Sequence, residues 1–125
     1  MTEFDLRLSL ADHFRSVAAW RRSRYRDDLR DPRNLVSAAG LDEMADWITR
    51  LPGGDPRLAT LARYAAVGAS FTPGQQAHYE IGRFRFFQPD TEFDAFLDQL
   101  AQLAEADHVE RGQFGGRQAP GDEPW

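Results

Sequence analysis

The chain has 125 residues and a mass of 14.2 kDa, and its 15 basic residues, all arginine, against 20 acidic ones give a net charge of −5. It contains no cysteine, which excludes disulfides, thiolate metal sites and cysteine nucleophiles. No apolar run approaches the roughly 18 residues of a membrane span, and the amino terminus lacks the basic and apolar regions of a signal peptide, so we expect a cytoplasmic protein without a membrane partner.

The first ten residues carry two patterns. Apolar and polar residues alternate over 4–10, which is the period of a strand. Ser9 can also cap a helix that follows it. We therefore expect an extended arm to about Leu8 and a helix from Leu10 to about Leu29.

Four later positions have the residues that are typical of a helix start. Each places a side-chain oxygen that can accept free backbone N–H groups next to a proline, whose missing donor costs nothing in the first helical turn. The four are Asp31-Pro32, Asp55-Pro56, Thr72-Pro73 and Pro89-Asp90-Thr91. Apolar residues spaced three and four apart follow them, most clearly over 93–104, and Gly40 is a candidate kink.

The sequence thus predicts an all-α fold, a compact bundle of about five helices in one domain over residues 1–110. One alternative stays open, because arginine and phenylalanine alternate over 83–87 as in a strand that could pair with the amino-terminal arm. Residues 111–125 are rich in glycine, proline and charge without periodicity, which predicts a flexible tail.

Charge is distributed unevenly. Residues 15–33 hold seven arginines against three acids, and residues 87–110 hold seven acids and no base. The two segments can complement each other within one molecule or between two. Exposed pairs contribute only about 0–1 kcal/mol each, so they would orient a contact and not hold it.

The best binding candidate is the run from Trp20 to Arg26, which holds four arginines with two aromatic residues interleaved among them. Such a run can meet an acidic protein surface or clamp phosphates and bases, or it can pack and pair internally. Five phenylalanines also crowd into residues 84–96, and an exposed part of that cluster would be an association surface. The residues that we predict to bind are Trp20, Arg21, Arg22, Arg24, Tyr25, Arg26, Phe86 and Phe87.

Candidate chemistry is sparse. Glu105 and His108 have the Glu-x-x-His spacing of di-iron bundles, with Glu80 as a further ligand, although a solvated helix end explains that pair as well. His78, Tyr79 and Glu80 are adjacent, so on a regular helix they diverge by about 100° each. No serine lies in a nucleophile motif, and a chain without lysine has no Schiff-base chemistry.

By elimination, the sequence favours a non-catalytic interaction or regulatory module without a cofactor, which binds a protein partner or a second copy of itself through the Arg/aromatic surface. The alternatives are a metal- or small-ligand-binding helical protein and a nucleic-acid-binding protein that uses Arg21–Arg26. A fold of strands would overturn this interpretation, as would a deep cleft in which His78, Glu80 and an arginine meet.

Overall fold

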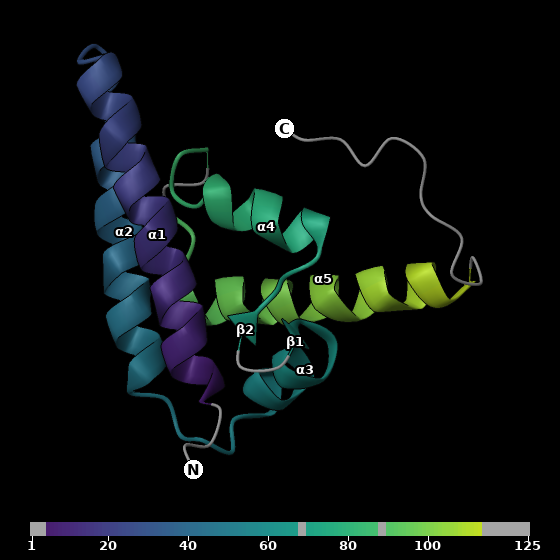
Figure 1. Cartoon of the computed structure of the whole chain (residues 1–125). Helices are drawn as coiled ribbons and strands as arrows, with labels where there is room; N and C mark the ends of the chain where they lie inside the picture. The colour runs from purple at the N-terminus through teal and green to yellow at the C-terminus, as the bar shows by residue number, and fades with distance from the viewer. Residues whose placement is uncertain (1–4, 68–69, 88–89, 114–125) are drawn as a thin grey trace.

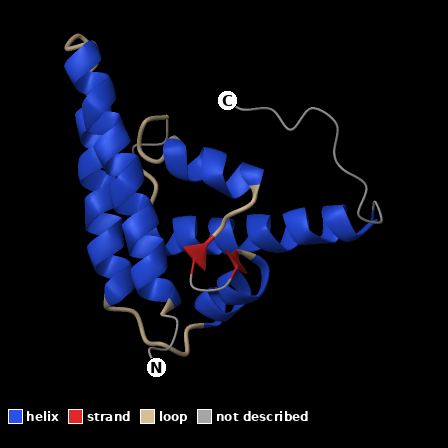
Figure 2. Cartoon of the chain, in the orientation of Figure 1, coloured by secondary structure: helices blue, strands red, loops and turns tan. Residues whose placement is uncertain are grey.

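The computed structural model of the chain describes residues 5–67, 70–87 and 90–113. Within them helices dominate, and the two strands form one short hairpin (Figure 2). The elements are α1 (Leu6–Asp27), α2 (Arg33–Thr49), α3 (Pro56–Tyr64), β1 (Ala66–Val67), β2 (Ser70–Phe71), α4 (Gln75–Gly82) and α5 (Phe93–Gln113). The predicted all-α bundle of about five helices is confirmed.

Helices α1 and α2 form a long antiparallel hairpin, and α5 runs crosswise to it (Figure 1). Helix α4 and helix α3 both pack on α5, on opposite sides of it in this view. The far end of the α1–α2 hairpin, where the two helices connect, projects beyond the other helices. The core therefore lies where the nearer part of the hairpin meets α4 and α5.

Three buried phenylalanines mark the centre of that core. The ring centroids of Phe84 and Phe96 are 4.4 Å apart, and those of Phe14 and Phe96 are 6.3 Å apart. The other large side chains that are fully buried are Leu10, Leu41, Met44, Ile48, Leu61, Ile81, Leu97 and Leu100. Those of α2 and α5 fall at the spacings of three and four that the sequence showed, so each helix buries the face expected of it.

Three helix starts use the same Asp-x-Arg motif. The aspartate accepts the backbone N–H of the arginine two residues later, and the guanidinium of that arginine returns to the carboxylate. The pairs are Asp5 with Arg7, Asp31 with Arg33 and Asp55 with Arg57, with backbone N···Oδ1 distances of 3.0, 3.2 and 2.9 Å. The arginine side-chain hydrogen bond is the largest influence holding the pKa of each of these aspartates below its usual value.

The first of these motifs corrects the expected amino-terminal arm. Helix α1 begins at Leu6 because Asp5 caps it, so the chain is helical and not extended from Leu6 to Leu8. Leu6 and Leu10 are both buried and stand four residues apart, a spacing that suits a helix as well as a strand. Residues 1–4 of the expected arm lie outside the described residues.

The two-stranded sheet is not the one considered from the sequence, which would have paired the amino-terminal arm with residues 83–87. Strands β1 and β2 pair antiparallel over residues 66–71, while 83–87 form turns around a single bridge residue, Phe84. The pairing considered for the arm from residue 5 onward is therefore wrong, because that stretch belongs to α1. A side chain makes the link to the sheet instead: the N–H of Phe71 donates to Ser9 Oγ at 2.7 Å.

Helix α2 continues without a break through Gly40, the position at which the sequence suggested a kink. Gly40 is buried, and a Cβ atom there would lie 2.5 Å from Cδ of Arg85. Arg85 itself has a positive φ of 62°, which is uncommon for a residue other than glycine. Its guanidinium carbon lies 5.2 and 5.3 Å from the ring centroids of Phe84 and Phe93. Gly40 thus makes room for the side chain that holds the turn after α4 against α2.

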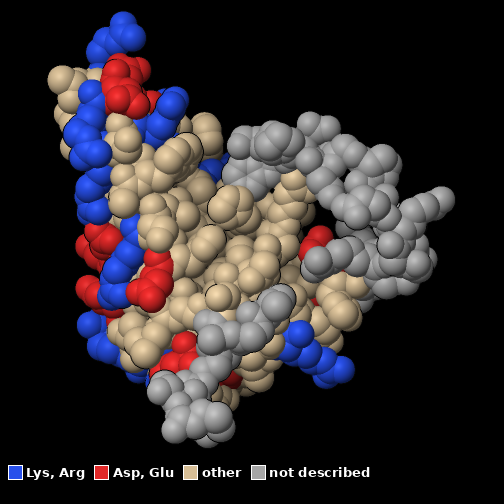
Figure 3. All heavy atoms as spheres, in the orientation of Figure 1, with Lys and Arg blue, Asp and Glu red and all other residues tan. Residues whose placement is uncertain are grey.

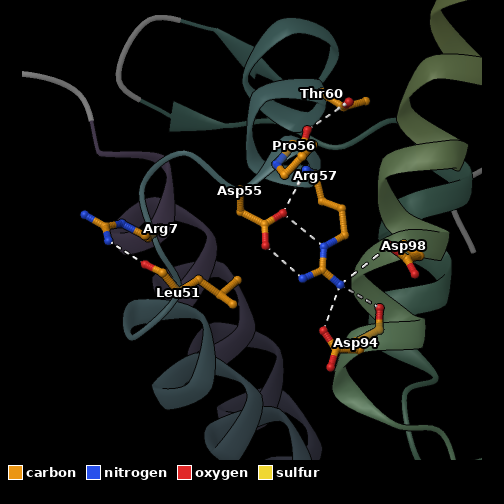
Figure 4. A network of polar contacts seen from close by, with 8 residues as sticks. All are labelled: Arg7, Leu51, Asp55, Pro56, Arg57, Thr60, Asp94 and Asp98. Carbon is orange, nitrogen blue, oxygen red and sulfur yellow. Dashed lines mark hydrogen bonds and ion pairs between the residues drawn. The ribbon is translucent and has the colours of Figure 1, made fainter.

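A network around Arg57 joins α3 to the acidic start of α5 (Figure 4). The Arg57 guanidinium lies 2.8 Å from Oδ2 of Asp55, 2.9 Å from Oδ1 of Asp94 and 3.5 Å from Oδ1 of Asp98. The acidic segment 87–110 therefore forms ion pairs with Arg57 of α3, and Arg57 does not belong to the basic segment 15–33. Within the described residues, the ion pairs of that basic segment go to aspartates of α1, α2 and their connection.

Helix α5 ends at Gln113, three residues beyond the expected end of the helical part. Residues 111–113 of the expected tail are therefore helical, and 114–125 lie outside the described residues. In the part of the chain that the structure covers, no helix combines the length and the apolar character that crossing a membrane requires.

Candidate functional site

A pocket of about 530 Å³ opens between the middle of α1 and the end of α4 with the turn that follows it. Its lining consists of His13, Ser16, Val17, Trp20 and Arg21 from α1, and His78, Tyr79, Gly82, Arg83 and Phe87 from α4 and the turn. This volume lies within the range of about 300–1,000 Å³ that is typical of small-molecule sites.

Helical spacing places these residues together. On α1, positions 13, 16, 17 and 20 fall on one face, beside the stripe that enters the core. On α4, Gly82 stands one turn after His78 and leaves open space where a side chain would stand, since a Cβ atom there would have no neighbour within 4 Å. Gly82 thus adds to the open space of the pocket where the end of α4 approaches α1.

Two histidines meet at one end of the pocket. Their ring centroids are 5.5 Å apart, and the His13 ring also meets the ring of Phe71 edge to face at 5.4 Å. Nε2 of His13 is buried and has no hydrogen-bond partner among the described residues. Burial, and then repulsion from His78, lower the pKa of His13 to about 4, and burial also lowers the pKa of His78. Both rings are consequently neutral at pH 7.

Arg21 forms one wall. Its Nε donates to the carbonyl oxygen of Gly82 at 2.9 Å, Nη2 donates to the same oxygen, and Nη1 donates to Oδ1 of Asn34 at 3.1 Å. The guanidinium lies over the rings of Trp20 and Phe86, with the guanidinium carbon 4.7 and 4.4 Å from their centroids. Burial lowers the pKa of Arg21, which remains charged at neutral pH. Unlike Arg22, it forms no ion pair within the described chain.

Arg83 forms the opposite wall. Its guanidinium lies over the rings of Tyr79 and Phe87, at 5.4 and 5.1 Å from their centroids, and Nη1 is 3.7 Å from Oε1 of Glu80. A cleft in which His78, Glu80 and an arginine meet would overturn the interpretation made from the sequence. His78 and Arg83 do line one pocket, whereas Glu80 contacts Arg83 and does not line the pocket.

Aromatic side chains surround the opening. Trp20, Tyr79 and Phe87 are 50 %, 40 % and 56 % exposed, which is high for large side chains beside an apolar hollow. Figure 3 shows that the face beside the α1–α2 hairpin is largely uncharged, whereas arginines and acids concentrate along the hairpin itself. The rim therefore offers flat, solvent-accessible rings to a ligand that enters the pocket.

The structure separates the predicted binding residues into two groups. Three of them line the pocket, namely Trp20, Arg21 and Phe87, and a fourth, Phe86, is half-buried beneath the guanidinium groups of Arg21 and Arg33. The other four do not line it. Arg22 pairs with Asp42 of α2, Tyr25 is half-buried, and Arg24 and Arg26 are exposed toward the far end of the hairpin.

Several lining residues escaped the sequence argument. The sequence neighbours of His13 and of His78 do not indicate a site, because the two histidines stand 65 positions apart. The one local signal is the stripe at 13, 16, 17 and 20 that flanks the core face of α1. Among the described residues no three His, Asp or Glu side chains stand close enough to hold a metal ion, and His108 instead contacts the ring of Tyr64 at 4.8 Å.

Comparison with known protein families, with curated proteins and with solved structures finds no match to this chain. A fold class by itself does not determine function, so the geometry and chemistry of the pocket are what indicate a function for this chain.

Proposed function

We propose that this protein is a binding protein that holds a small, largely apolar organic molecule in the pocket between α1 and α4. The observation that carries the proposal is a hollow of about 530 Å³ whose walls combine aromatic rings with a few fixed polar groups. Sites that bind small molecules have this composition, with an apolar lining for affinity and convergent polar groups for orientation.

The polar groups are held in place before any ligand arrives. Arg21 is fixed by the carbonyl of Gly82 and by Asn34, and Arg83 is fixed over two rings. A preorganised site loses little conformational entropy on binding. A two-ring aromatic ligand buries about 150–250 Å², which after the cost of association supports a Kd on the order of 10–100 µM.

The neutral fluorescent probe N-phenyl-1-naphthylamine tests this proposal. We expect saturable binding to the unaltered chain, followed by the rise in probe emission. Ser16→Phe fills the pocket from an exposed position and should weaken binding about tenfold or more, since the ring then occupies the ligand's space. Ala19→Phe adds the same ring at an exposed position of α1 outside the pocket and should leave the affinity unchanged.

Non-saturable binding to the unaltered chain would reject the pocket as a ligand site. Equal affinity of the Ser16→Phe and Ala19→Phe variants would reject it as well, because the probe would then be bound elsewhere. Far-ultraviolet circular dichroism of each variant verifies that the helices are retained.

We propose as a second candidate that the chain associates with a second copy through the far end of the α1–α2 hairpin. Leu29, Leu35 and Val36 are exposed there, beside the exposed Arg24 and Arg26, in the part of the hairpin that projects beyond the other helices (Figure 1). Clustered exposed apolar residues are typical of association surfaces. The acidic face of α5 in another copy carries the opposite charge, and a two-fold dimer satisfies both contacts reciprocally.

Light scattering at low salt tests the second candidate. The unaltered chain should show twice the mass of 14.2 kDa, and the dimer should weaken above about 0.5 M salt, where charges are screened within a few ångströms. Arg24→Glu combined with Arg26→Glu should shift dissociation to about tenfold higher protein concentration, whereas Arg63→Glu, an exposed arginine of α3, should not. A monomer at low salt would exclude this candidate.

A further inference from the structure

Among the described residues, the charged groups that line the pocket are all of one sign. Arg21 and Arg83 belong to this lining and no described carboxylate does, although the whole chain carries a net charge of −5. A cleft with low-dielectric walls concentrates the field of such groups. The pocket is therefore a locally positive site in an acidic protein.

Among the described residues, Arg21 has no carboxylate at ion-pair distance, and the charge of Asp31 acts on it only from farther away. The Arg21 guanidinium donates hydrogen bonds to a backbone carbonyl oxygen and to a side-chain amide oxygen, both of which are uncharged. It also packs against the rings of Trp20 and Phe86. The short-range ion pairs of the described residues do not include it, whereas its neighbour Arg22 pairs with Asp42. A partly buried guanidinium that is not directly paired with a carboxylate gains from a ligand that brings a negative charge.

Arg83 is only partly neutralised. Its closest approach to Glu80 is 3.7 Å, which is an ion pair but longer than a direct hydrogen bond. Its Nε atom is buried and has no hydrogen-bond partner among the described residues. The guanidinium therefore keeps donor capacity, and its fork geometry suits the paired oxygens of a carboxylate, sulfonate or phosphate.

The histidines at the other end of the pocket add no charge, because both rings are neutral at pH 7, and their ring centroids lie 5.5 Å apart. The exposed rings of Trp20, Tyr79 and Phe87 supply the apolar part of the surface. Cationic donors and flat apolar walls thus occupy one small volume.

We propose that the occupant of this pocket is an aromatic organic anion, with its ring system against Trp20, Tyr79 and Phe87 and its acidic group toward Arg83 and Arg21. This inference rests on the proposed ligand-binding function and specifies the class of ligand. A neutral apolar molecule fits against the same walls but brings no negative charge to either guanidinium group. A cationic ligand is disfavoured, because it would meet two like charges.

Two probes with the same rings separate these cases. 8-Anilinonaphthalene-1-sulfonate carries the phenylaminonaphthalene skeleton of N-phenyl-1-naphthylamine plus one sulfonate. On the unaltered chain at about 50 mM salt, we expect the sulfonate probe to bind about tenfold more tightly than the neutral one, and this advantage should shrink as salt is added. The comparison requires no variant.

A paired substitution then locates the anion. Arg83→Met keeps the apolar stem of the side chain and removes its charge, and Glu80→Gln in the same chain avoids leaving a lone carboxylate. In this variant the affinity for the sulfonate probe should fall about tenfold more than the affinity for the neutral probe does. Arg15→Met, which removes an exposed arginine of α1 outside the pocket, should change neither affinity.

The outcomes distinguish the two proposals. If the neutral probe binds saturably and the sulfonate probe binds no more tightly, the pocket remains a ligand site and the anionic class is wrong. If the sulfonate probe binds more tightly but the Arg83→Met, Glu80→Gln variant binds it as well as the unaltered chain does, the anion lies elsewhere and the inference is wrong. If neither probe binds saturably, both the proposed small-molecule binding and the proposed anionic class of ligand are wrong.

Discussion

Replacing Phe96 by alanine is expected to lower the free energy of unfolding by about 3–5 kcal/mol. Phe96 is fully buried and stands between two other buried rings, Phe84 at 4.4 Å and Phe14 at 6.3 Å. These rings come from α1, from the turn after α4 and from α5, so a cavity at Phe96 loosens all three elements at once. Domains of this size have about 5–15 kcal/mol of stability in total, so the variant should be close to unfolding.

Urea denaturation followed by circular dichroism measures this loss. Phe96→Leu keeps most of the apolar volume and should cost less than about 2 kcal/mol. Phe87→Ala removes the same ring from an exposed position and should cost less than about 1 kcal/mol. A loss at Phe96→Ala no larger than that at Phe87→Ala would contradict the placement of the ring cluster at the centre of the core.

The helices that the sequence predicted best are those whose apolar spacing is long and regular. Residues 93–104 repeat large apolar side chains every three to four positions, and the structure buries Phe96, Leu97 and Leu100 in α5. Amphipathic spacing is a local property of the chain, so it can be read without knowing what the helix packs against. The same holds for Met44 and Ile48 of α2.

Helix α1 begins at Leu6 and not at Leu10 as the sequence predicts, because one residue decides between the strand pattern and the helix pattern. Over residues 4–10 the alternation suits a strand, but Leu6 and Leu10 also lie four apart. Asp5 resolves the ambiguity, since its carboxylate accepts the N–H of Arg7 and begins the helix there. The later starts at Asp31 and Asp55 are predicted by an aspartate followed by a proline. Asp5 shares their Asp-x-Arg contacts in the structure but has no proline beside it to mark the start.

The candidate site could be predicted only in part, because its two halves are far apart in the chain. The Arg/aromatic run drew attention to Trp20 and Arg21, and both line the pocket. However, the bond that turns Arg21 inward goes to Gly82, which stands 61 positions away. Nothing local to either segment specifies that partner. His13 and His78 meet for the same tertiary reason, which composition and spacing do not encode.

Acidification from pH 7 to pH 4 is expected to destabilise the protein by about 2 kcal/mol through His13 alone. Burial, with a smaller effect of His78, lowers the pKa of His13 to about 4 in the folded chain, whereas an unfolded histidine keeps its ordinary value of 6.5. Between these two values the unfolded chain binds a proton that the folded chain does not, so stability falls as the pH falls through that window. Since the ring borders an open pocket, the loss stays below the full value of about 1.4 kcal/mol per pKa unit.

The aspartate caps act in a separate window. Their folded pKa values lie below the usual 3.8, so their contribution is present above that value and is lost only as the pH falls below it. His13→Leu should therefore flatten most of the stability profile between pH 6.5 and pH 4 and leave the steeper loss at lower pH, as measured by urea denaturation at each pH. If His13→Leu loses stability between pH 6.5 and pH 4 as steeply as the unaltered chain does, the buried neutral His13 is not the cause, and the apolar character of that end of the pocket is refuted with it.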